Sequence, residues 1–135
     1  MKRDSQKIEP PVAGIFGNLY KPEVFSLIKG ITEALELNGF SYFIDRDLAK
    51  AAGIRSSKNI AGTKAIISKA GVVLSLGGDG TFLSTAQKVG GADIPILGVN
   101  LGRLGYFSEI TPEEIDKFIP NLRTGKFRIS EQVML

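Results

Sequence analysis

Two patterns of apolar residues alternate along this chain. Apolar runs of strand length lie at 12–17, 41–44, 72–76 and 94–99, and another begins at 127. Between them, apolar residues recur every three or four positions, as on the buried face of a helix. These helical segments lie at 22–38, 63–70 (weakly patterned), 80–88 and 112–124. The alternation predicts an α/β fold, with an open, mostly parallel sheet and helices on both faces.

Proline, glycine and a capping box mark where helices begin and end. Pro22 opens the first helix, where its missing N–H costs nothing, and Gly39 closes it. A capping box, Thr111-Pro112-Glu113-Glu114, opens the last helix. Residues 45–62 are less regular, and we expect a short helix at 47–52 and a loop at 55–59. The residues expected on the inner face of the 80–88 helix and its end are Phe82, Leu83, Ala86 and Val89.

The chain is expected to form one α/β domain over residues 12–130. Its 135 residues suit a single domain with a substantial core. Residues 1–11 are polar and end in two prolines, which predicts a flexible leader. The last residues, 132–135, form a mostly apolar stretch that reads as the middle of a strand, so we expect the natural protein to continue beyond Leu135.

The composition restricts the chemistry that this domain can perform. Cysteine and histidine are both absent, which excludes disulfides and thiolate chemistry and disfavours a zinc site. A general acid or base must therefore be Asp, Glu, Lys or Tyr, and a bound metal would be a hard cation such as Mg²⁺. The net charge of +3 comes from scattered residues, so nucleic-acid binding is not indicated. No apolar run is long enough to span a membrane, and we expect a cytoplasmic protein.

Three loops of the expected sheet should meet at one edge. In open parallel sheets, ligands bind beyond the carboxyl ends of the strands. The segments that follow three of the expected strands are 17–18, 77–81 and 100–105. This edge is therefore the predicted ligand site.

The segment Gly77-Gly78-Asp79-Gly80-Thr81 has the composition of a phosphate-binding turn. Its first two glycines allow a sharp turn and close approach of a ligand to the main chain. Gly80 and Thr81 begin a helix, whose unpaired N–H groups attract phosphate. A carboxylate beside phosphates has two uses: it can accept a proton from an attacking hydroxyl, or hold Mg²⁺.

This turn also has two purely structural explanations. An Asp-Gly hairpin would require an antiparallel strand after it, but the residues that follow have helical spacing. Asp79 as a helix N-cap is compatible with a chemical role. Neither the G-x-G-x-x-G nor the G-x-x-x-x-G-K-[ST] phosphate motif occurs in the chain, so the site is of another type.

The Gly-Gly-Asp-Gly-Thr motif is shared by NAD kinases, diacylglycerol-type lipid kinases and, loosely, phosphofructokinases. Residues 95–107 read PILGVNLGRLGYF. This resembles the second NAD kinase motif, in which a strand ending in Gly-x-Asn leads into Gly-x-Leu-Gly-Phe. Tyr106 stands where phenylalanine is more usual. The lipid kinases have a Gly-Thr-x-Asn-Asp-type loop there instead. The resemblance covers most of the chain from Val12 and is strongest at 72–83 and 94–107.

The resemblance implies a reaction and roles for individual residues. NAD kinases phosphorylate the adenosine 2′-hydroxyl of NAD, using ATP or polyphosphate and a divalent metal such as Mg²⁺. In this chain, we expect the metal to be held through phosphates and not by protein ligands. Carried over, Asp79 would be the catalytic base, and Gly78 and Gly80 would contact the dinucleotide. The residues expected to line the nucleotide pocket are Leu83, Leu104, Gly105 and Tyr106. Asn100 would brace its loop, and Arg103 would either face phosphate or be solvated.

The resemblance also implies a second, mostly β domain, which supplies about half the site and most oligomer contacts. Residues 131–135 would be its start, and the fragment alone is expected to be inactive. The full protein would bind NAD and ATP and form a homo-oligomer, without nucleic-acid or membrane partners. Two alternatives stay open: the nucleotide domain of a diacylglycerol-type lipid kinase, and a non-catalytic nucleotide-binding module.

Overall fold

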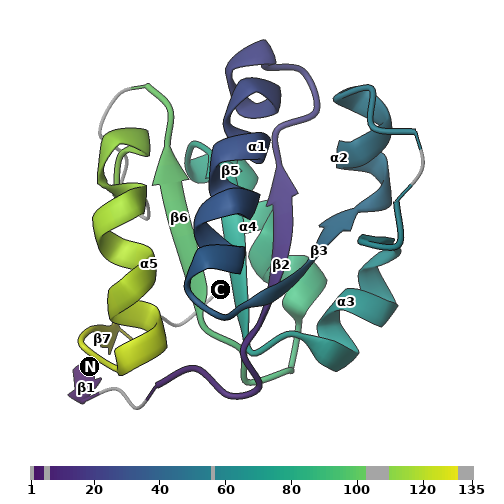
Figure 1. Cartoon of the computed structure of the whole chain (residues 1–135). Helices are drawn as coiled ribbons and strands as arrows, with labels where there is room; N and C mark the ends of the chain where they lie inside the picture. The colour runs from purple at the N-terminus through teal and green to yellow at the C-terminus, as the bar shows by residue number, and fades with distance from the viewer. Residues whose placement is uncertain (1, 5–6, 56, 103–109, 131–135) are drawn as a thin grey trace.

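The fold is a parallel β-sheet with helices on both faces (Figure 1). The computed structural model describes residues 2–4, 7–55, 57–102 and 110–130. The sheet consists of β2 (Val12–Gly17), β3 (Ser41–Asp45), β4 (Ile60–Ala61), β5 (Val72–Gly77) and β6 (Ile96–Asn100). The helices are α1 (Pro22–Leu37), α2 (Arg46–Ala51), α3 (Thr63–Lys69), α4 (Asp79–Val89) and α5 (Ile115–Thr124), the last preceded by the 3₁₀ turn η1 (Pro112–Glu114). The predicted fold class is confirmed.

The sheet is buried on both faces because apolar side chains alternate between two cores. In β5, Val72, Leu74 and Leu76 belong to the larger core, which α1 and α5 cover. Val73 belongs to the smaller core, under α3 and α4, and packs with Ile66 and Val89. Every residue of β5 is buried, as its near-continuous apolar run predicts for a covered parallel strand.

The order of the strands is β4-β3-β2-β5-β6, with every neighbouring pair parallel. The chain therefore builds outward from β2 to β4, then returns to the other side of β2 with β5. The connection that leaves β2 leads to β3 on one side, and the connection that leaves β5 leads to β6 on the other side. The space between β2 and β5 is therefore the topological switch point of the sheet. In open α/β sheets, ligands bind at the carboxyl ends of the strands that flank such a point.

Three strands differ from the sequence prediction. Residues 60–61 form β4, where a strand was not predicted, because two residues are too few to show a pattern. The strand expected from residue 127 exists as β7 (Arg128–Ser130), but it does not join the parallel sheet. It pairs antiparallel with β1 (Lys2–Asp4), within the segment predicted to be a leader.

The N-terminal segment also contacts the domain through Ile8. This side chain is only 4% exposed and belongs to the larger core. Its N–H donates a hydrogen bond to the carbonyl of Leu122 in α5, at 3.3 Å. One apolar residue in a polar segment shows no periodicity, so the sequence did not indicate this contact. In the described part of the chain, no helix has the length and apolarity to cross a bilayer.

The predicted capping box before α5 is confirmed and has a pH-dependent effect. The Thr111 N–H and hydroxyl both donate to Glu114 Oε1, at 2.9 and 3.1 Å. These bonds, the backbone one first, lower the pKa of Glu114 below its ordinary value of 4.5. A carboxylate with a lowered pKa stabilises the fold above its unfolded-state pKa and loses this contribution as the pH falls through its folded-state pKa.

A Glu114→Gln variant should therefore be less stable than the wild type at pH 7. The difference should start to shrink as the pH falls below the ordinary value of 4.5, and vanish once the pH is below the lowered folded-state pKa. Urea unfolding at pH 7, 5 and 3.5 would measure it. Glu113→Gln, at an exposed position on the same turn, controls for the loss of one negative charge. An equal destabilisation by Glu114→Gln at all three pH values would contradict the prediction.

Candidate functional site at the carboxyl edge of the sheet

The three predicted loops meet at the carboxyl edge of the sheet. Gly17 pairs with Leu76, and Gly77 with Asn100, so β2, β5 and β6 end together. Beyond the strands, the Asn18 N–H donates to the carbonyl of Leu76 at 2.9 Å. The N–H of Leu101 donates to the carbonyl of Gly77 at 3.2 Å. The predicted convergence is confirmed for the described residues of these loops.

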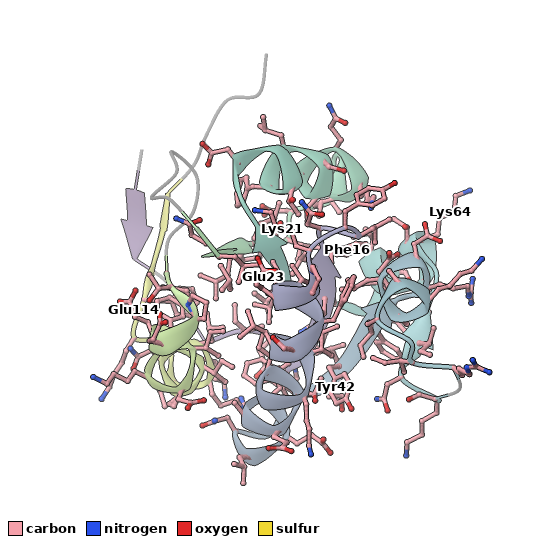
Figure 2. All side chains as sticks on the ribbon, turned by 90° about the horizontal axis from the view of Figure 1, so that it is seen from above. Phe16, Lys21, Glu23, Tyr42, Lys64 and Glu114 are labelled. Atoms are coloured by element: carbon pink, nitrogen blue, oxygen red, sulfur yellow. The ribbon has the colours of Figure 1, made fainter. Side chains whose placement is uncertain are left out.

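Figure 2 looks down on this edge. Lys21 and Glu23, at the start of α1, lie near its middle, and Lys64 lies on the rim. Lys21, Glu23 and Lys64 are all exposed. The chain after β2 turns through Asn18, whose Oδ1 accepts a hydrogen bond from the Tyr20 N–H at 2.8 Å. This side-chain turn fixes the first of the three loops.

Asp79 is the first residue of α4 and lies directly beyond the switch point. Gly78 caps the helix with an extended backbone, at φ −121° and ψ −160°. Asp79 is half-buried. The first turn of a helix has unpaired N–H groups and a positive dipole end, both of which favour an anion. The turn therefore places a carboxylate and the N–H groups of a helix N-terminus at one position.

The glycines of this turn have different surroundings. A Cβ on Gly77 would lie 2.5 Å from Thr81 Oγ1 and 2.8 Å from Thr81 Cβ, so the residue must be glycine for α4 to pack this closely. A Cβ on Gly78 or Gly80 would meet no atom within 4 Å. Gly77 thus serves internal packing, whereas Gly78 and Gly80 leave open space beside Asp79.

The inner face of α4 differs in part from the sequence prediction. Val89 is buried as expected, but Phe82, Leu83 and Ala86 are only half-buried. Thr85 is buried instead, at 1% exposed. The helix turns this hydroxyl towards Ser75 of β5, and the two oxygens lie 3.0 Å apart. Leu83 consequently stays accessible one turn after Asp79, on the same side of the helix.

The other predicted site residues lie after β6. Asn100 is 5% exposed, and its Oδ1 accepts a hydrogen bond from the Gly102 N–H at 3.1 Å. Arg103, Leu104, Gly105 and Tyr106 lie outside the described residues.

Sequence reasoning did not single out Asp45, a second carboxylate at this edge. It ends β3 and is 4% exposed. Its carboxylate accepts hydrogen bonds from the Leu48 N–H at 3.3 Å and from the Thr63 hydroxyl at 3.5 Å. Asp45 therefore caps α2 and ties it to the start of α3. Its place between a strand and a short helix was the available signal for this role.

Among the described residues, Asp79 does not belong to a group of side chains that could bind a metal ion together. Among the residues that the structure describes, no three acidic side chains gather closely enough to hold a metal ion. A single carboxylate at a helix N-terminus suits a hard cation that takes its other ligands from phosphates. The described donor set fits a divalent ion that arrives with a phosphorylated ligand.

Residues 12–127 match the family of ATP-NAD kinase N-terminal domains. The chain belongs to this family. Among curated relatives, the NAD kinase of Syntrophotalea carbinolica is 34% identical over 122 residues, 90% of this chain and 42% of the relative. The NAD kinase of Bacteroides fragilis is 34% identical over 132 residues, which cover 90% of this chain and 43% of the relative. This NAD kinase domain thus spans less than half the length of these relatives.

The fold of this NAD kinase domain is also found in a solved structure. A crystal structure of yeast NADH kinase complexed with NADH matches with a TM-score of 0.70. The match covers 89% of this chain and 38% of the yeast chain, at 18% sequence identity. The two proteins therefore share the domain fold described above.

Proposed function

We propose that this chain is the N-terminal, nucleotide-binding part of an NAD kinase. The complete enzyme transfers a phosphoryl group from ATP or polyphosphate to the adenosine 2′-hydroxyl of NAD, which gives NADP. The observation that carries this proposal is the position of Asp79 on the first turn of α4, at the switch point, beside the open space at Gly78 and Gly80. The family match supports NAD as the substrate in this proposal.

Asp79 acts as the general base in this proposal. Its carboxylate accepts the proton of the 2′-hydroxyl while the oxygen attacks the transferred phosphorus atom. The helix N-terminus supplies N–H groups to phosphate oxygens, without a positively charged side chain.

The neighbouring residues bind and orient the dinucleotide. Gly78 and Gly80 let the ligand approach the backbone, because neither position has a side chain to fill the open space. Leu83 is half-buried on the same side of α4 and offers apolar contact to the nucleotide. We also propose that Leu104, Gly105 and Tyr106, which lie outside the described residues, line the nucleotide pocket, as the resemblance implies. Arg103 is a further candidate for a phosphate contact. Asn100 holds the start of their loop.

Mg²⁺ or another divalent cation completes the proposed chemistry. When bound, the ion neutralises charge on the donor phosphates and on the transferred group. It is held mainly through those phosphates. Asp79 is the described side chain placed to reach it, directly or through water.

The rest of the proposed enzyme lies outside this chain. Because the chain spans 42% of a curated relative, we propose that a second, β-rich domain follows it and supplies the remaining substrate contacts. The complete protein is proposed to act in the cytoplasm as a homo-oligomer.

The test is an assay of the full-length protein that contains this chain. With NAD, Mg²⁺ and either ATP or polyphosphate, the full-length protein should form NADP. Under the same conditions, the 135-residue chain alone should form no measurable NADP. The NADP formed can be measured by chromatography or by a coupled assay with an NADP-specific dehydrogenase. Phosphorylation of diacylglycerol without NADP formation would instead identify a lipid kinase. Nucleotide binding without turnover of either substrate would indicate a non-catalytic module.

A further inference from the structure

Two buried hydroxyl groups connect the strand before the site to the helix after it. Ser75 of β5 is 2% exposed and Thr85 of α4 is 1% exposed. Their side-chain oxygens lie 3.0 Å apart. Thr85 Oγ1 also donates a hydrogen bond to the carbonyl of Thr81, in the first turn of the helix, at 2.9 Å.

The direction of the Ser75–Thr85 bond follows from the number of protons available. A hydroxyl group has one proton to donate and can accept through its lone pairs. Thr85 donates its proton to the Thr81 carbonyl, so Ser75 must donate to Thr85. The result is a directed chain from the middle of β5 through α4 to the first helical turn.

Close packing at Gly77 constrains the same turn from a second direction. The position that a Gly77 Cβ would occupy is 2.5–3.1 Å from three side-chain atoms of Thr81, so this threonine lies directly against the strand backbone. Thr81 is thus held by its carbonyl through Thr85 and by its side chain against Gly77. Asp79 lies two residues before it, in the same turn.

We infer that Ser75 and Thr85 are positioning residues for Asp79. The hydroxyl chain fixes the first turn of α4 relative to the carboxyl edge of β5, and so fixes the carboxylate and the adjacent N–H groups where phosphoryl transfer takes place. The inference rests on the proposed function. Neither residue contacts the reacting atoms, so their removal acts on the geometry of Asp79 and not on its chemistry.

The first variant to test is Thr85→Val in the full-length protein, because valine keeps the shape of threonine and lacks the hydroxyl. We expect kcat to fall about 10-fold with KM for NAD changed less than about twofold, since small displacements of a reacting group cost rate more than binding. Thr85→Ser keeps the hydroxyl and should retain wild-type kcat. Thr32→Val is the matched control: Thr32 is a buried helical threonine in α1 with its own bond to the Lys29 carbonyl, and kcat should not change.

A double variant, Ser75→Ala with Thr85→Val, separates positioning from stability. Removing both hydroxyls leaves no buried polar group without a partner, so stability should return close to the wild-type value. The hydroxyl chain is still absent, so kcat should stay about 10-fold low. Recovery of kcat together with stability would overturn the inference, as would unchanged kcat in Thr85→Val.

A measurement on the 135-residue chain keeps the inference testable without turnover. The ¹⁵N order parameters of residues 79–81 should fall in Thr85→Val and in the double variant, and stay unchanged in Thr32→Val. Unchanged order parameters in the first two would overturn the inference. Failure of the wild-type protein to form NADP would instead refute the proposed function, while these order parameters would still decide whether the hydroxyl chain orders the turn.

Discussion

An Asp79→Asn variant of the full-length protein is expected to form NADP about a thousandfold more slowly and to bind NAD nearly as tightly as the wild type. Asparagine has the size and shape of aspartate but cannot accept the proton of the 2′-hydroxyl, and a general base typically contributes 10²–10⁴-fold to a rate. Steady-state kinetics give kcat, and calorimetry gives the dissociation constant of NAD. The expected effect is on kcat, because the base acts mainly in the transition state.

The control for this prediction is Asp47→Asn. Asp47 is an exposed acid in the first turn of α2, so its replacement removes one negative charge from a helix N-terminus away from the switch point. Its activity should match the wild type. Full activity of Asp79→Asn would exclude Asp79 as the base. A loss confined to NAD affinity would assign Asp79 to binding.

Replacement by alanine is expected to have different effects at the adjacent glycines Gly77 and Gly78: at Gly77 it should lower stability, and at Gly78 it should lower NAD affinity alone. In Gly77→Ala, the new methyl group would lie 2.8 Å from Thr81 Cβ, an atom that the helix holds in place and that side-chain rotation cannot move. Helix α4 must then shift away from β5, which costs about 1–3 kcal/mol of stability, as for other overpacked core positions. The shift also stretches the Ser75–Thr85 bond and displaces Asp79, so activity should fall as well.

Gly78→Ala should leave stability within about 0.5 kcal/mol of the wild type. Its backbone is extended, which any residue can adopt, and its methyl group would enter open space. The same methyl group occupies room proposed for the ligand, so NAD affinity should fall. Urea unfolding and calorimetry measure the two effects. Equal loss of stability in both variants would contradict the distinction drawn between these glycines.

The parallel strands could be predicted from the sequence because burial on both faces produces continuous apolar runs. The run at 72–76 is the clearest example, and every residue of it is buried. The helices were predictable from their periodicity and end signals, such as Pro22 and the capping box before α5. Strands that carry no such run were missed. β4 has two residues, and β1 is a charged segment whose strand conformation depends on pairing with β7.

The location of the candidate site could be predicted from the sequence, but the contacts that hold its first helical turn in place could not. The turn at 77–81 has a recognisable composition, and the α/β pattern places it at the carboxyl edge. The same composition does not distinguish Gly77, where an added Cβ would meet Thr81, from Gly80, where an added Cβ would enter open space. The contact between Ser75 and Thr85 depends on the rotation of α4 about its axis, which a weakly amphipathic segment leaves undetermined. Apolar spacing favoured Phe82 and Leu83 for the inner face, whereas a hydrogen bond placed Thr85 there.

The strand order described above also determines when this site can form as the chain folds. β2 pairs with β3, the next strand along the chain, and with β5, which follows only after three helices. Closing the longer segment costs more chain entropy, so β2, β3 and β4 can associate before β5 adds to them. Until β5 is in place, the chain has half a sheet and no ligand site. A nucleotide that binds at this edge therefore stabilises the long-range pairing selectively, and its binding reports that the domain has finished folding.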